Sequence, residues 1–412
     1  MLDRASELVW GNGLVYLLLL TGILYTIKLK GIQIKMFPYI LKRAANGRIN
    51  GDGIRTICMS LGAAMGTGNI TGVASAIAIG GAGAVFWMWV SAFFGMATVY
   101  AENILSEKYS DDTAKGPMAY ISKGVGSRKL AYFFAVCCVF ASFGMGGMAQ
   151  ISTMSESIIR CTDINGFILA FIIFATVFAV ISGGAERIGK AAQILLPAAS
   201  VVYSAICLII IIRNRQVLPT VFERIFSEAF GFEQAVGGIC GHTIARTMSV
   251  GTRRGVFSNE SGLGSSPLLH SSHDSGSKTS YAVCAMIEVF IDTMICCTIT
   301  AVTLLCSSSD TTVRTAFISL TGSNTDLLLS AIMTVFAFCT VIGWYYCGET
   351  AFLHLFPESS VKKYSLLFAL VAASGTIIRS ETIWTLSDIF NGMMAFPNIL
   401  ALILLIKNVK AE

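Results

Sequence analysis

The stretch from Leu61 to Gly95 is apolar enough to lie in a bilayer, yet it carries a Gly-Thr-Gly-Asn cluster at residues 66–69. Glycine inside a helix costs about 0.5–1 kcal/mol relative to alanine, so the cluster predicts a break between two half-helices. Unwound backbone in hydrocarbon is tolerated only where it is buried in protein or lines a cavity. The amides exposed at such a break favour an anionic group such as a carboxylate. Close helix packing is the other interpretation, because the same glycines recur four residues apart.

The composition indicates a polytopic membrane protein. Hydrophobic residues make up 54% of the 412 residues and charged residues 13%, and the mean hydropathy is +0.71. Soluble domains have nearer a quarter of their residues charged. Apolar runs long enough to cross a bilayer recur along the whole chain. We therefore predict an all-α polytopic membrane protein of about eleven transmembrane helices, with spans at 8–27, 56–80, 84–105, 130–158, 166–182, 191–212, 232–250, 281–306, 327–354, 364–378 and 387–406.

The basic residues predict the orientation of these spans. Of the 29 lysines and arginines, 22 fall on one side of the predicted topology and 7 on the other. Positive charge accumulates in cytoplasmic loops, so we expect the N-terminus outside and the C-terminus in the cytoplasm, in a multi-pass protein of the cell membrane. The net charge of +5 is spread over loops, so no nucleic-acid partner is predicted. Membrane lipid is the expected surrounding, and no obligatory protein partner is predicted.

The spans divide into one extra helix and two equal halves. Setting aside 8–27 leaves ten spans, five in residues 56–212 and five in residues 219–406. An odd number of spans gives the two halves opposite orientations, which is the condition for an inverted repeat. Residues 1–412 are therefore predicted to form a single transmembrane domain.

An inverted repeat predicts a second broken helix in the first span of the second half. That span holds the sequence GGICG at residues 237–241, which includes Gly238. Residues 251–255, GTRRG, are a rival position. The adjacent Arg253 and Arg254 are costly in the middle of a membrane, so we expect the break at GGICG and the arginines at the cytoplasmic end.

The segment GVFSNESGLGSSP, residues 255–267, is too polar to span a membrane and too distinctive for an ordinary linker. One interpretation is a capped helix end followed by a turn, with glycines as helix breakers. The other is a cytoplasmic gate, in which Ser258, Asn259 and Glu260 tie the segment to the inner ends of neighbouring spans. The residues alone leave both interpretations open.

Polar residues inside apolar spans are candidates for a functional site. They are Gln150, Asp292 with Glu288 one turn before it, and Thr340 and Trp344, which share a helix face. Each could instead make a hydrogen bond between helices without any ligand. Together with a broken glycine-rich helix, an amide, a hydroxyl and an aromatic ring suit a small zwitterion. A channel would need a ring or repeat of selectivity residues, and a membrane enzyme would need clustered catalytic groups; neither pattern is found.

Two residue types are expected to be structural. His270 and His273 stand in a serine-rich loop without a set of acidic or cysteine partners, so we expect them to be solvated and not to bind a metal. The twelve cysteines lie mostly inside spans and form no CxxC pair, so we expect small buried apolar side chains.

Several motifs resemble those of the alanine/glycine:cation symporter family. They are GTGNITGVASAI, GG-x-GAVFWMWVSA, Tyr100-Ala-Glu102, RGVFSNESGLGSSP and Asp292-Thr293, and the match runs from about residue 10 to 406. The resemblance implies uptake of alanine or glycine coupled to Na⁺, sometimes H⁺, and a leucine-transporter-like 5+5 inverted repeat. Two positions depart from the family pattern. Ala82 stands where the family usually has proline, which we expect to loosen a turn, and Ser261 stands where it usually has alanine.

The pattern and the resemblance together define candidate site residues. Oxygen ligands suit a hard cation such as Na⁺. The predicted cation ligands are Ala64, Thr67, Thr340 and, with less support, Asp292. The predicted substrate-binding residues are Gly66, Thr67, Gly68, Asn69, Gln150, Gly238, Thr340 and Trp344.

Overall fold

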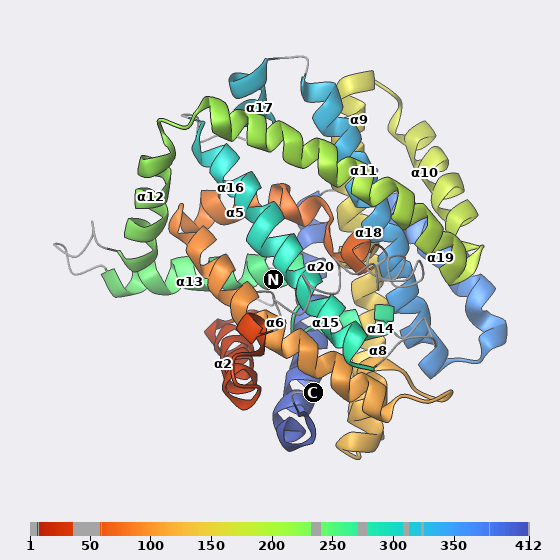
Figure 1. The fold of residues 1–412 in the computed structure, drawn as a ribbon. Coiled ribbons are helices and arrows are strands. Elements are labelled where there is room, and N and C mark those ends of the chain that lie inside the picture. The colour runs from red at the N-terminus through yellow and green to blue at the C-terminus, as the bar shows by residue number, and fades with distance from the viewer. Residues whose placement is uncertain are drawn as a thin grey trace.

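The computed structural model describes residues 6, 8–35, 58, 60–231, 240–270, 278–307, 313–322, 325–378 and 380–410 (Figure 1). All regular structure in these ranges is helical. The first part of the chain forms α2 (Asn12–Lys28), η1 (Thr67–Asn69), α5 (Thr71–Gly80), α6 (Gly83–Tyr109), α7 (Gly116–Ala119), η2 (Tyr120–Gly124), α8 (Arg128–Ala141), η3 (Ser142–Ala149), α9 (Gln150–Thr162), α10 (Gly166–Ile181), α11 (Gly184–Arg213) and α12 (Leu218–Phe230). The second part forms α13 (Cys240–Asn259), α14 (Ser266–His270), α15 (Lys278–Val289), η5 (Phe290–Cys297), α16 (Thr298–Leu305), α17 (Val313–Thr321), α18 (Thr325–Leu355), η6 (Glu358–Ser360), α19 (Val361–Ser374), α20 (Ser380–Leu404) and η7 (Ile406–Asn408).

The helices agree with the predicted spans. Within the described ranges, six helical segments are long and apolar enough to cross a membrane, namely Gly83–Tyr109, Arg128–Thr162, Gly184–Arg213, Tyr281–Leu305, Thr325–Leu355 and Thr382–Leu404. Each of the eleven predicted ranges overlaps a helix. The all-helical polytopic class is thus supported, whereas the number of eleven spans and the inverted repeat stay predictions.

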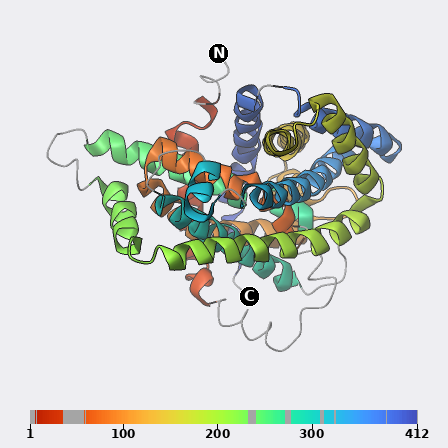
Figure 2. The ribbon, with the colours of Figure 1, turned by 90° about the horizontal axis from the view of Figure 1, so that it is seen from above.

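The long helices surround a central group of elements. In Figure 1, α11 crosses the top of the bundle, α12 and α13 lie on the left, and α10 and α19 lie on the right. Figure 2 shows α11 running along the periphery. Helix α18 lies inside, where Phe336 and Trp344 are fully buried. Such burial of large side chains stabilises the fold through close van der Waals packing between helices.

Two of the long helices contain a π-helical stretch. Segment η3 interrupts the helix that runs from Arg128 to Thr162, and η5 interrupts the one that runs from Tyr281 to Leu305. Such wide turns frequently mark functional positions, because they leave the regular i→i−4 hydrogen bonding. Gln150 follows η3 directly, and Asp292 lies within η5. The local geometry therefore singles out two of the predicted polar residues.

Helix α12 was not predicted, and it alters the interpretation of Ala82. Its apolar face buries Val221, Ile225 and Ala229. The carboxylate of Glu228 on this helix accepts a hydrogen bond from the Ala82 backbone N–H at 2.5 Å. A proline at this position would have no N–H to donate. The expectation that alanine loosens this turn is therefore wrong, because the turn is tied to α12.

The cysteines behave as predicted. The eleven cysteines whose side chains the structure describes form no disulfide bond with one another, and each is buried or half-buried. Most of them contribute to the packed interior as small apolar groups.

We expect Gly146→Ala to destabilise the protein. A Cβ at Gly146, in η3, would collide with the Cβ of Trp344 on α18, and neither atom can rotate away. Overpacking of this kind typically costs about 1–3 kcal/mol. Thermal unfolding of the detergent-solubilised protein should show a lower midpoint. Gly13→Ala is the matched control, because a Cβ there meets nothing within 4 Å; an equal midpoint for both variants would contradict the packing argument.

Candidate functional site

The predicted break in the first glycine-rich helix is present. Residues 60–64 are helical, η1 forms a short 3₁₀ turn at Thr67–Asn69, and α5 begins at Thr71. The three residues of η1 are buried. A Cβ at Gly66 would lie 2.6 Å from the Thr340 hydroxyl oxygen and 2.8 Å from the Gln150 amide oxygen. Glycine at this position therefore allows three predicted site residues to meet.

Gln150 covers the backbone amide that the break exposes. Its Oε1 accepts hydrogen bonds from the Thr67 backbone N–H at 3.0 Å and from the Thr67 hydroxyl at 2.8 Å. Its Nε2 donates to the Met145 carbonyl at 3.3 Å. The amide oxygen of Gln150 thus satisfies a backbone donor that the break exposes. Thr67 and Gln150, both predicted as substrate ligands, are in direct contact.

Thr340 lies on the other side of the break. Its hydroxyl donates to the Gly62 carbonyl at 3.0 Å, which belongs to the last turn before the break. The Ala64 carbonyl nearby accepts a hydrogen bond from the Gly66 N–H at 2.8 Å. The predicted cation ligands Ala64, Thr67 and Thr340 thus lie close together in space at the break. Carbonyl and hydroxyl oxygens of this kind suit a hard monovalent cation.

A second helix is interrupted within the 255–267 segment. Helix α13 ends at Asn259, a turn follows at 260–265, and α14 begins at Ser266. Glu260 has a left-handed φ of +57° and Gly262 has +83°. A non-glycine residue in this region is uncommon and is found at turns and at functional sites.

The structure describes only the last two residues of the predicted second break, GGICG at 237–241, so that position stays a prediction. Cys240 and Gly241 begin α13, and the helix continues through Arg253 and Arg254. Gly238 lies outside the described residues.

Arg253 contacts residues that are distant in the sequence. It forms an ion pair with Asp388 and donates a hydrogen bond to the Ser6 hydroxyl at 3.0 Å. The predicted topology puts both partners near the outer surface, so this topology and a cytoplasmic arginine pair exclude each other. The acidic partner reduces the cost of placing this charge among helices.

Asp292 joins the two interrupted helices. Its Oδ1 accepts from the Asn69 side-chain amide at 2.6 Å, and its Oδ2 accepts from the hydroxyls of Ser258 at 2.7 Å and Thr293 at 2.9 Å. Asn69 belongs to the first break, and Ser258 belongs to the last turn before the second. The fully buried carboxylate therefore uses both of its oxygens to fix one broken helix to the other.

The predicted gating residues are buried in the same region. Ser258 contacts Asp292, and the Asn259 side-chain amide donates to the Thr293 hydroxyl at 3.1 Å. Glu260 accepts from the Trp344 indole N–H at 2.7 Å and from the Ser265 hydroxyl at 2.5 Å. These residues do connect their segment to neighbouring helices, but to η5 and the middle of α18 instead of to helix ends.

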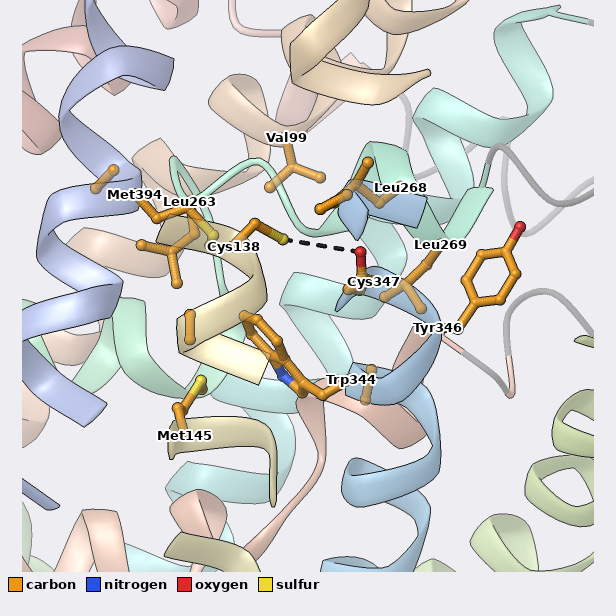
Figure 3. Close-up of a cluster of buried hydrophobic side chains, with 14 of the residues drawn as sticks. Val99, Cys138, Met145, Leu263, Leu268, Leu269, Trp344, Tyr346, Cys347 and Met394 are labelled. Atoms are coloured by element: carbon orange, nitrogen blue, oxygen red, sulfur yellow. Dashed lines mark hydrogen bonds between the residues drawn. The ribbon is translucent and has the colours of Figure 1, made fainter. Parts of the chain in front are cut away.

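Trp344 closes one side of this arrangement. Its ring lies in a buried cluster with Met145 of η3 and Leu263 of the second break (Figure 3). In the same cluster the Cys138 thiol donates to the Cys347 carbonyl at 3.8 Å. The indole therefore spans from an apolar wall to the buried carboxylate of Glu260.

Asn398 and Glu102, which were not predicted as site residues, hold the turn of the second break. The side-chain amide of Asn398 donates to Glu102 Oε1 at 2.5 Å and to the Gly262 carbonyl at 2.9 Å. Tyr120 donates to the Asn398 oxygen. Glu102 is fully buried in α6, and a buried acid inside an apolar span was the available signal.

A cavity of about 500 Å³ approaches the first break from one side. Its polar lining includes Thr71, Ser75, Thr153, Ser157 and Ser330. Thr71 begins the half-helix after the break, and Thr153 lies one turn after Gln150. Ligand sites are generally cavities with a few convergent polar groups, so this one provides a route towards the break.

The charged groups of this cavity are already paired. Arg160 forms an ion pair with Glu156, and Arg314 donates to Asp326 at 2.6 and 2.5 Å. The described ranges contain no group of three or more His, Cys, Asp and Glu side chains that could hold a metal ion.

We expect Asp292→Asn to destabilise the protein more than Ser258→Ala. Asparagine replaces one acceptor oxygen by a donor, which leaves a buried donor facing other donors, at a typical cost of about 1–3 kcal/mol. Ser258→Ala leaves Oδ2 bonded to Thr293. Thermal unfolding in detergent measures both, and a midpoint for Asp292→Asn at or above that of Ser258→Ala would refute the tie between the helices.

Comparisons with known proteins identify the family of the chain. The sodium:alanine symporter family matches residues 1–412. The sodium/alanine symporter AgcS of Methanococcus maripaludis is 36% identical over 98% of this chain and 94% of its own length. A Haemophilus influenzae transporter is 35% identical over 98% of this chain and 92% of its own. The probable sodium/glutamine symporter GlnT of Bacillus subtilis is 33% identical over 98% of this chain and 87% of its own. The chain therefore belongs to the sodium:alanine symporter family.

Proposed function

We propose that the chain couples the flow of Na⁺ to uptake of a small neutral amino acid, alanine or glycine, by alternating access. H⁺ is the alternative coupling ion. As a member of a symporter family, the chain is a multi-pass membrane transporter and not an enzyme. The observation that supports the finer proposal most is the broken helix, whose Thr67 amide faces a polar acceptor in the protein interior. Discontinuous helices at mid-membrane are the binding elements of secondary transporters.

The substrate carboxylate is proposed to bind at the first break. The backbone from Gly66 to Asn69 would supply amide donors, and the side chain of Gln150 would turn from Thr67 to the substrate. Gly66 leaves no room for an added methyl group, whereas a Cβ at Gly68 would make only ordinary contacts with Phe257. Gly66 is thus the stricter requirement of the two glycines.

Trp344 is proposed to limit the size of the substrate. One methylene in a hydrophobic pocket is worth only about 1–3 kcal/mol, so exclusion of larger amino acids needs steric closure. The buried ring of Trp344 lies between the two breaks and provides such a wall. The names of the relatives include both alanine and glutamine, so the wall around Trp344 is the place where substrate choice would be set.

The cation is proposed to bind where Ala64, Thr67 and Thr340 meet. Release of the Thr340 hydroxyl from Gly62 would free two oxygens for a monovalent ion. Asp292 would act mainly by fixing the geometry, since both of its oxygens already accept hydrogen bonds from the protein.

The cavity is proposed to open to the outside. The topology with an external N-terminus and a cytoplasmic C-terminus puts α17, the end of α9 and the start of α18 in the outer half of the membrane. These elements line the cavity, together with α5. An amino acid arriving from outside would thus reach the break beside Thr71. The predicted inverted repeat would relate the two broken helices and would allow the opposite side to open in turn.

The decisive measurement is uptake into proteoliposomes. We expect saturable alanine uptake that requires an inward Na⁺ gradient and is not supported by K⁺ or pH gradients alone. Liposomes without protein are the control, and competition by glycine and glutamine defines the substrate range. Non-saturating flux would indicate a channel instead, and uptake driven equally by a pH gradient would assign H⁺ as the coupling ion.

We expect Thr340→Val to raise the Na⁺ concentration for half-maximal uptake. Valine keeps the shape of threonine but removes the hydroxyl, and the loss of one ligand should cost about a factor of ten. Thr334→Val is the matched control, because the Thr334 hydroxyl bonds only to the Ser330 carbonyl of its own helix. An unchanged Na⁺ dependence in Thr340→Val would exclude this hydroxyl from the cation site.

A further inference from the structure

A cluster outside the proposed substrate site joins three segments at one carboxylate. Glu288, on α15, is buried, and its Oε2 accepts a hydrogen bond from the Ser60 hydroxyl at 2.6 Å. His270 Nε2, at the end of α14, lies 3.2 Å from the same oxygen. The His270 ring also packs against Tyr281 at 5.9 Å between centroids. The sequence-based expectation of a solvated His270 was therefore wrong, whereas His273 lies outside the described residues.

The cluster joins three segments. They are the part of the first broken helix before its break, the part of the second broken helix after its break, and the helix that carries Asp292. Ser60 precedes the first break, and His270 follows the second. Glu288 lies one turn before Asp292, which binds Asn69 at the first break and Ser258 before the second. Each of the two acids therefore bridges both broken helices, and the two bridges lie on opposite sides of the breaks.

The cavity and the cluster are also on opposite sides. Along the first broken helix, the cavity begins at Thr71, after the break, while Ser60 lies before it. Along α18, Ser330 and Met333 line the cavity, whereas Gly343, beyond Thr340, packs against Ala63. The proposed path of the substrate therefore has a cavity on one side of the break, whereas the helices are closely packed on the side of Glu288.

The cluster is only partly satisfied. Both bonds go to a single oxygen of Glu288, while its Oε1 and the His270 Nδ1 have no hydrogen-bond partner among the residues that the structure describes. A buried carboxylate with one unpartnered oxygen holds its neighbours less firmly than one in which both oxygens are bonded. At Asp292, both carboxylate oxygens accept hydrogen bonds. The two ties therefore differ in strength, and the one at Glu288 is the easier to open.

We propose that Ser60, His270 and Glu288 form a latch that closes the proposed path of the substrate on the side opposite the cavity, and that its opening releases the substrate to that side. The proposal rests on the proposed transport function, because a latch of this kind has a role only if access alternates. The three are positioning residues, since none of them touches the proposed substrate. Opening separates residue 60 and α14 from α15 and leaves the Asp292 tie in place.

Two native cysteines report on the two sides. Cys58 lies two residues before Ser60 and is 7% exposed, so a closed latch should protect it from thiol reagents. Cys161 lines the cavity and is half-buried, so it should react. The full chain in proteoliposomes would be treated with N-ethylmaleimide without any amino acid, and the modification rate of each cysteine would be followed by mass spectrometry of its peptide.

We expect Glu288→Ala to raise the modification rate of Cys58 by about tenfold and to lower that of Cys161, because loss of the hydrogen bonds to a charged group shifts the balance towards the other access state. Ser60→Ala removes one bond, keeps the pair with His270, and should give a smaller change in the same direction. Glu349→Ala is the matched control, since the Glu349 carboxylate bonds to Tyr345 of its own helix. It should leave both rates unchanged.

The outcomes separate the latch from a general loss of structure. A rise at Cys58 with a fall at Cys161 supports the latch. Protection of Cys58 in both Glu288→Ala and Ser60→Ala, a rise at Cys58 without a fall at Cys161, or a parallel rise at both cysteines would overturn it. The labelling measurement uses no amino acid and is therefore independent of the uptake assay. Failure of wild-type alanine uptake would contradict the proposed substrate, while the modification rates would still test the latch.

Discussion

Two carboxylates, one helical turn apart, connect the two broken helices, in which the backbone hydrogen bonding is interrupted. Asp292 and Glu288 are carried by one continuous helix, and each reaches both interrupted helices. A buried carboxylate is costly unless donors surround it. The donors must therefore come from the neighbouring helices at fixed places, and this requirement sets the relative position of the two breaks. The π-helical turn around Asp292 gives that side chain the freedom to meet its three donors.

The features that could be predicted from the sequence are those with a local cause. Glycine at positions 66 and 68 predicts the first break because backbone propensity acts within a few residues. Gln150 and Thr340 were predicted as site residues because a polar group in an apolar span must find a partner. The structure gives both of them partners at that break. The helical class follows in the same way, because only helices or closed barrels satisfy their backbone within a bilayer.

The features that were missed depend on pairing between distant segments. The second interruption has a glutamate in a left-handed conformation, and that choice is made by the turn around Glu260, not by a local preference of the residue. His270 stands in a polar stretch that indicates solvent, yet its partner Glu288 comes from another helix. Ala82 gains its role from Glu228 on a helix that no apolar span indicated. In each case the partner, and not the residue itself, carries the missing information.

The contact between Gln150 and Thr67 has a consequence for binding strength. The protein supplies its own acceptor for the amide at the break, so a carboxylate that binds there exchanges one hydrogen bond for another. Its affinity then reflects only the difference between a charged and a neutral acceptor, and not the whole of the new bond. Gln150 would thus compete, from within the protein, with the proposed substrate carboxylate for this amide. A protein that must let go of its cargo in every cycle gains from such a competitor, because dissociation leaves no buried donor without a partner.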